Sequence, residues 1–178
     1  MDLERLSIGI IGAIVGVVGW LFVGLYIDRR SRQTAARNAA RVVYFELVGN
    51  HLTIFTALEY GAFGPLARAS FDRLLPELAT WLSIEDLQAV ALAYLGHGGY
   101  EQVTSDPTLP PEVRRHALLG LHEAHRVAVR VLRARAFDRH EIERLAAFAS
   151  PDQMRLLEAA DASPARPARS PEASRAGS

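Results

Sequence analysis

The longest apolar run in the chain is residues 8–27, IGIIGAIVGVVGWLFVGLYI, which contains no charged residue and no proline. Its length matches the ~20 residues that a helix needs to cross a hydrocarbon core about 30 Å thick. A helix buried in a soluble protein is rarely so long and so uniformly apolar. We therefore predict a single transmembrane helix over residues 8–27.

The segment before this run, MDLERLS, argues against a cleaved leader. A secretory signal peptide begins with a positively charged region and ends in a small-x-small cleavage site. Here two acidic residues accompany one arginine, and the run closes on Leu25-Tyr26-Ile27. A mitochondrial presequence is poor in acidic residues and fits no better. The pattern favours an uncleaved anchor.

The flank after the run sets the orientation. Residues 28–41 contain five arginines and one aspartate, and cytoplasmic flanks collect such positive charge. We predict that the N-terminus faces outward and that the rest of the chain is cytoplasmic. We expect Arg29, Arg30, Arg32 and Arg37 to contact the headgroups of membrane lipid.

Four glycines in the run fall on one side of a helix. At 100° per residue, Gly9, Gly12, Gly16 and Gly19 lie within an arc of roughly 80°. Small residues at such spacing let two membrane helices approach closely, although glycine is also common in membrane helices generally. We predict a homo-oligomer packed through this face, either a dimer or a larger ring.

Helical periodicity continues beyond the membrane. Residues 33–62 read as a long helix, either continuous with the span or separate from it, and apolar around most of its circumference. Glu46 and Asn50 form a narrow polar strip at i, i+4 spacing. One possibility is that the two side chains hydrogen-bond to one another or cap a neighbouring helix. The other is a candidate buried polar site, in which the Glu46 carboxylate belongs to a ligand-binding site.

Turn residues divide the remaining chain into further helices. Ser83 is placed to cap one helix, and Pro110 or Pro111 to begin another. No stretch alternates as a β-strand, so the predicted class is all-α: one transmembrane helix followed by a bundle of about four helices. The predicted helices cover residues 66–82, 84–95, 111–137, 139–148 and 151–160.

Five segments follow from these patterns. They are a short extracytoplasmic N-terminus (1–7), the transmembrane helix (8–27), a basic juxtamembrane segment (28–41), a cytoplasmic helical domain (42–160) and a disordered tail (161–178) rich in Pro, Ser and Arg.

Charge is balanced over the chain and uneven along it. Residues 42–111 carry a net charge of −6 and residues 112–144 one of +3, so we expect an acidic middle packed beside a basic helix. All twenty basic residues are arginine, which together with the abundant alanine is typical of a GC-rich bacterial genome. We expect no nucleic-acid partner, because the domain has no net positive charge. A stripe of arginines lies on the predicted helix 111–137 and consists of Arg115, Arg126, Arg130 and Arg133. We expect it to form ion pairs within the chain, and we rank contact with the membrane surface second.

Catalytic and metal motifs are weak. The chain has no cysteine, which excludes disulfides and thiolate chemistry. His122 and His125 are spaced i, i+3 rather than the i, i+4 of a zinc protease helix, with His125 on the core seam and His122 toward the arginine stripe. We predict no metal, no cofactor and no enzyme activity.

Three short segments carry a family resemblance. The run ARVVYFELVGN at residues 40–50 is followed by Trp81-Leu82 and by ALAY at residues 91–94. In these segments the chain resembles small uncharacterised bacterial proteins that have one N-terminal span and a helical cytoplasmic domain. The resemblance covers most of residues 8–135, and it implies that architecture and no activity.

Together these features predict a single-pass protein of the bacterial inner membrane. Its expected function is that of a non-enzymatic interaction or scaffolding module, with an unidentified protein partner. The alternative is a sensor of a small molecule or metal, or an unrecognised enzyme, using Glu46, Asn50 and His125 inside the bundle.

Overall fold

The computed structural model describes residues 2–148, with side chains described for residue 20 and residues 23–147. Every element in that part of the chain is helical, which confirms the all-α class. The helices are α1 (Asp2–Tyr60), α2 (Ala69–Ala79), α3 (Ile84–Leu95), α4 (His97–Ser105), α5 (Pro111–Ala136) and α6 (Arg139–Phe148).

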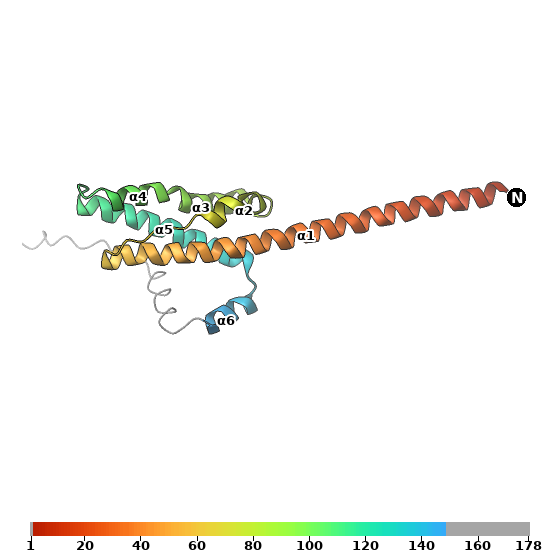
Figure 1. The fold of residues 1–178 in the computed structure, drawn as a ribbon. Helices are drawn as coiled ribbons and strands as arrows, with labels where there is room; N and C mark the ends of the chain where they lie inside the picture. Colours follow the sequence, from red (N-terminus) through yellow and green to blue (C-terminus); the bar gives the residue numbers. More distant parts are fainter. Residues whose placement is uncertain (1, 149–178) are drawn as a thin grey trace, which may run out of the picture.

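The longest element, α1, is one uninterrupted helix of 59 residues. At 1.5 Å per residue it is about 90 Å long. Its C-terminal half packs into the bundle, whereas its N-terminal half projects from the bundle as a rod (Figure 1). The sequence left two possibilities open at the end of the apolar run, and the structure has the continuous helix.

Among the side chains that are described, no helix combines the length and the apolar character required to cross a membrane. Of the predicted span 8–27, only residue 20 and residues 23–27 belong to that set. The predicted glycine face, Gly9, Gly12, Gly16 and Gly19, lies outside it. The predicted helix 151–160 and the predicted tail 161–178 also lie outside the described residues.

Two helix starts follow the sequence prediction. The Ser83 hydroxyl accepts a hydrogen bond from the Asp86 amide at 3.2 Å and so caps α3, and Pro111 occupies the first turn of α5. The end of α1 depends on Gly61, whose φ of 65° is a left-handed conformation that only glycine adopts readily. These residues fix where the chain turns.

Two predicted elements differ from the structure. The second helix covers Ala69–Ala79 rather than residues 66–82, because the chain before it has no regular structure and is held against α1 by Asn50. The predicted break at residues 96–99 is confined to Gly96, after which α4 begins at once. A Cβ at Gly96 would clash with Leu121 Cδ1, so the glycine lets α5 approach the junction closely.

Helix α5 occupies the centre of the bundle, where it packs against α1, α3 and α4 (Figure 1). Two groups of buried apolar residues form the core. The first core cluster includes Ala40, Val43, Leu47, Phe71, Leu78, Val90, Tyr94, Ala128 and Leu132. The second core cluster contains Ile54, Ala57, Tyr100, Val103, Leu118 and Leu121.

Helix α6 returns to α1 on the side opposite α2–α4 (Figure 1). Arg37 and Arg41 both donate through Nε to the Ala136 carbonyl, at 2.9 and 3.1 Å, where the C-terminal end of α5 carries partial negative charge. Both guanidinium groups also pair with the Glu141 carboxylate. Part of the basic segment 28–41 therefore holds α6 in place.

Candidate functional site

Glu46, one of the two polar residues singled out on α1, contacts the beginning of α2. Its Oε2 accepts a hydrogen bond from the Ser70 amide at 2.8 Å, and its Oε1 accepts one from the Phe71 amide at 3.2 Å. These amides belong to the first turn of α2, which has no side-chain cap of its own. The Glu46 carboxylate thus caps α2 from a neighbouring helix, where a negative charge is favoured by the helix dipole.

The same carboxylate also binds a buried tyrosine. Tyr94, 1% exposed, donates its hydroxyl to Glu46 Oε1 at 2.8 Å, and its ring stacks on Phe71 with centroids 4.1 Å apart. Burial acts to raise the pKa of Glu46, but the hydrogen bonds from Ser70, Tyr94 and Phe71 lower it below the ordinary value. Burial and the adjacent carboxylate raise the pKa of Tyr94. Glu46 is therefore ionised and Tyr94 neutral at pH 7.

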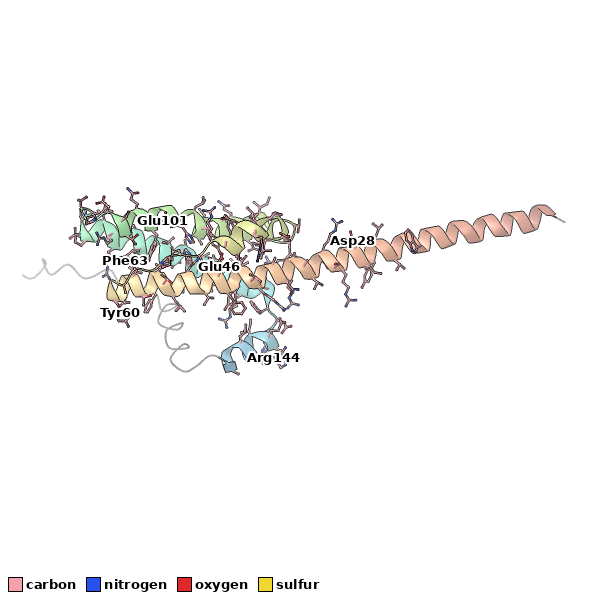
Figure 2. The ribbon with its side chains drawn as sticks, viewed as in Figure 1. Asp28, Glu46, Tyr60, Phe63, Glu101 and Arg144 are labelled. Carbon is pink, nitrogen blue, oxygen red and sulfur yellow. The ribbon has the colours of Figure 1, made fainter. Side chains whose placement is uncertain are left out.

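Asn50, one turn along α1, holds the segment that leads into α2. Its Nδ2 donates to the Ala67 carbonyl and its Oδ1 accepts from the Ala67 amide, both at 2.7 Å. The side chain is 2% exposed, so both ends of the amide are satisfied away from solvent. Glu46 and Asn50 do not bond to one another; together they fasten residues 67–71 to α1 (Figure 2 shows Glu46 between the helices).

Four buried histidines form the second polar feature of the interior, which we call the histidine layer. Their exposed fractions do not exceed 6%, although imidazole is polar and carries hydrogen-bonding nitrogens. They come from three helices, α1, α4 and α5. The members are His51, His97, His122 and His125.

The histidine layer falls between the two core clusters. Each segment that contributes to it has a residue of the first cluster on one side and a residue of the second on the other. These flanking pairs are Leu47 and Ile54 around His51, Tyr94 and Tyr100 around His97, and Ala128 and Leu121 around the α5 histidines.

His97 and His125 bond to one another through their Nε2 atoms, 3.2 Å apart, with nearly parallel rings. His125 Nδ1 lies 3.0 Å from the Leu121 carbonyl, which can only accept, so this nitrogen carries the proton. The Nε2 of neutral His125 is then the acceptor, and His97 donates through Nε2. One tautomer of each ring satisfies the pair.

Burial keeps both of these imidazoles neutral. It lowers the pKa of His125 to about 4, with His97 and His122 nearby adding to the effect. Burial also lowers the pKa of His97, and Arg68 acts in the same direction, against the opposing carboxylates of Glu46, Glu101 and Asp72. The pair carries no net charge at pH 7.

The other two histidines lie against each other. The rings of His51 and His122 stack with centroids 4.4 Å apart and planes 21° apart. The prediction that His122 faces the arginine stripe is wrong, because its side chain is 2% exposed, whereas His125 lies on the core seam as predicted. The sequence analysis did not identify the histidine layer, although each histidine occupies a helical position that usually holds an apolar residue.

The His97–His125 pair is the part of the histidine layer whose spacing suits a metal ion. Two Nε2 atoms 3.2 Å apart could share one ion, since Zn–N bonds are about 2.0–2.1 Å long. Within the described residues, however, no three His, Asp or Glu side chains are arranged to hold an ion. The histidine layer therefore consists of the neutral, hydrogen-bonded pair His97 and His125 and the stacked pair His51 and His122.

The four arginines expected at lipid headgroups have different surroundings. Arg32 pairs with Asp28 at 2.8 Å on the exposed rod, and Arg29 and Arg30 lie on the same exposed stretch. Arg37 instead contacts the end of α5 and α6. Three of the four thus lie outside the bundle on α1.

No family model, curated protein or solved structure matches the chain. Its function is therefore inferred from its own residues.

Proposed function

We propose that the protein is a membrane-anchored, non-enzymatic interaction or scaffolding module. Residues 8–27 span the bacterial inner membrane, residues 1–7 lie outside, and the helical bundle is cytoplasmic. The observation that carries the proposal is the continuity of α1, which joins the apolar run to the bundle without a break over 59 residues. A helix without a hinge transmits the position and rotation of its membrane half directly to the bundle.

The apolar run and its flanks support the anchor. The run is long enough to cross a bilayer, and the arginines that follow it match a cytoplasmic boundary. The exposed residues of α1 just beyond the run include Arg29, Arg30 and Arg32, which suit an anionic lipid surface.

Self-association through Gly9, Gly12, Gly16 and Gly19 is compatible with the bundle. At 100° per residue along a continuous helix, these positions lie roughly 140° around α1 from the stripe that packs into the bundle. Two copies packed along their glycines would therefore carry their bundles on the outside, where they do not collide. The scaffold then presents at least two bundles to a partner.

An exposed apolar stripe on α3 supports an interaction role. Ile84, Leu92 and Leu95 are 82, 53 and 69% exposed, and their spacing places them on one side of the helix. Exposed apolar side chains grouped in this way commonly mark protein contacts. We assign this stripe to the protein partner.

The polar interior supports a structural role for its residues. Glu46 and Asn50 use their hydrogen-bonding groups on the backbone of residues 67–71, and the His97–His125 pair is satisfied internally. Substitution of these groups is expected to change stability rather than to remove an activity.

Reconstitution of the full chain tests the proposal. We expect it to float with liposomes after a carbonate wash and to give multiples of the 19.5 kDa chain by native mass spectrometry. The double variant Gly12→Ile, Gly16→Ile should float equally well and give the single chain, while Gly24→Ile, outside the glycine face, should remain oligomeric. Wild-type protein that is removed by carbonate would overturn the anchor, and an oligomer unaffected by the double variant would overturn the glycine interface.

A sensor or unrecognised enzyme with its site inside the bundle is the second candidate. The observation favouring it is the convergence of the His97 and His125 Nε2 atoms in the interior. This candidate predicts that Zn²⁺ raises the thermal midpoint of the full-length protein and that His97→Phe abolishes the increase. An unchanged midpoint with excess Zn²⁺ would contradict the metal form of this candidate.

A further inference from the structure

A cavity of about 880 Å³ opens where α1 leaves the bundle, between α1 and the C-terminal end of α2. Its wall on α1 includes Leu25, Asp28, Arg29 and Arg32, and its wall on α2 includes Glu77. Figure 2 shows Asp28 on the part of α1 that has left the bundle. The cavity therefore combines apolar, basic and acidic groups in one place.

The α1 wall continues the core-facing side of the helix. Leu25, Arg29, Arg32 and Ala36 are spaced four, three and four residues apart, which places them on one face. Ala36 is 2% exposed and begins the part of that face that packs into the bundle. On the N-terminal side of Ala36 the same face carries Arg32, Arg29 and Leu25, which no helix of the described chain covers.

The α2 wall supplies a carboxylate with an unused acceptor. Glu77 Oε2 is buried and has no hydrogen-bond partner among the described residues. The Glu77 side chain lines the cavity, where an ammonium group would pair with its carboxylate through a charge-assisted hydrogen bond. With Asp28 paired to Arg32, the four charged residues of the wall carry no net charge, which suits a ligand that has both a phosphate and an ammonium group.

The position of the cavity identifies the source of such a ligand, on the premise that α1 is the proposed anchor. At 1.5 Å per residue, Arg29 and Arg32 lie roughly 3–8 Å beyond the end of the apolar run. The headgroup layer on each side of a bilayer is about 5–8 Å thick. Leu25 is then level with the acyl chains, and Trp81 lines the far wall of the cavity.

We propose that this cavity binds phosphatidylethanolamine. The phosphate contacts Arg29 and Arg32, the primary ammonium donates to Glu77, and the acyl chains run beside Leu25. Phosphatidylcholine has no N–H donor for the Glu77 carboxylate, and phosphatidylglycerol has no cation to match it. The cavity therefore selects a headgroup by its ammonium group and not only by its negative charge.

Lipid retention by the full-length protein tests this selection. The protein is placed in nanodiscs containing equal amounts of the three phospholipids, released with mild detergent and analysed by native mass spectrometry. We expect retained phosphatidylethanolamine to exceed each of the others by about tenfold, the value of one charge-assisted hydrogen bond. Glu77→Gln should remove the preference, and Arg29→Gln should lower retention of phosphatidylethanolamine by a similar factor.

Matched variants and one competitor complete the test. Glu101→Gln and Arg73→Gln remove exposed charges outside the cavity and should leave retention unchanged. Glycerophosphoethanolamine at millimolar concentration should not displace the lipid; displacement would show that the free headgroup suffices and would overturn the assignment to a lipid. Equal retention of the three lipids, or a preference that survives Glu77→Gln, would overturn the site. Flotation of the same sample shows separately whether the anchor itself holds.

Discussion

His97 and His125 face one another through Nε2 atoms 3.2 Å apart, in the layer that separates the two core clusters. Each ring comes from a different helix, so the bond joins α4 to α5 at a depth where water does not reach. The bond requires at least one neutral ring, because two imidazolium groups would have no acceptor between them, and burial keeps both rings neutral. The stability of the bundle should therefore depend on pH.

The direction of this dependence follows from the lowered pKa values. An unfolded imidazole titrates near 6.5, whereas His125 in the folded protein titrates at about 4. Between these values the unfolded chain binds a proton that the folded chain does not, so the free energy of unfolding falls as the pH is lowered. His97 contributes with the same sign. The slope is about half its full value near pH 6.5 and vanishes above about pH 7.5, where the unfolded imidazoles are neutral as well.

We therefore predict a loss of up to ~1.4 kcal/mol per pH unit from His125 between pH 6.5 and 5, with a further loss of the same sign from His97. Urea unfolding of the full chain at several pH values measures this slope. His125→Gln should reduce the slope by the equivalent of about one bound proton. The control His140→Gln, at an exposed residue, should leave the slope unchanged. A free energy of unfolding that is flat from pH 6.5 to 5 would contradict neutral burial of the pair.

Glu46→Gln tests the cap on α2. The neutral amide loses one charged acceptor for the Ser70 and Phe71 amides, so we expect the free energy of unfolding to fall by about 1–2 kcal/mol. Chemical denaturation at pH 7 measures the loss. Glu59→Gln, an exposed residue of the same helix, is the control and should change stability by less than about 0.5 kcal/mol. Equal stability of wild type and Glu46→Gln would show that the carboxylate does not cap α2.

Two glycine substitutions should have opposite signs. Gly61→Ala places a side chain at φ 65° with open space around it, so the backbone alone should cost about 1–2 kcal/mol. Gly120→Ala lies within α5, also with open space, and should stabilise by about 0.5–1 kcal/mol through helix propensity. Thermal unfolding of the two variants beside wild type provides the measurement. A Gly61→Ala variant as stable as wild type, or more stable, would mean that the end of α1 is not set by the backbone of Gly61.

Glu141→Gln tests the attachment of α6. Loss of the carboxylate removes the ion pairs with Arg37 and Arg41, so amide hydrogen exchange within α6 should become faster while α3 and α5 are unaffected. The difference from wild type should shrink as salt is raised, because these charges are partly exposed. Glu143→Gln, which loses pairs only within α6, serves as the control. Unchanged exchange in Glu141→Gln would assign the attachment to other contacts, such as Phe137 on Tyr44.

The helices were readable from the sequence where the signal is local. Ser83 and Pro111 mark helix starts by chemistry that acts within one turn, and the lack of β alternation is a property of short windows. The start of α2 was not readable, because Asn50 binds the backbone of Ala67 across a separation of 17 residues.

The polar interior also combines features that local sequence predicts with contacts between distant segments that it does not. The i, i+4 spacing of Glu46 and Asn50 revealed a shared face of α1, but their partners lie on the backbone of another segment, which the sequence does not locate. His51 was overlooked because it is alone on its own helix, and His97 was considered only as a distant candidate, like His116, for a metal shared with His122 and His125. Only the packing of α1, α4 and α5 brings them beside the histidines of α5.

The accessibility of single cysteines most directly tests the proposal that α1 is a continuous membrane anchor. The chain has no cysteine, so Ser7→Cys and Ser31→Cys each introduce a unique label site on either side of the apolar run. In intact bacterial spheroplasts, a membrane-impermeant maleimide should label Ser7→Cys and should label Ser31→Cys only after lysis. Labelling of Ser31→Cys in intact spheroplasts, or labelling of both positions only after lysis, would contradict a span with its N-terminus outside and its bundle in the cytoplasm.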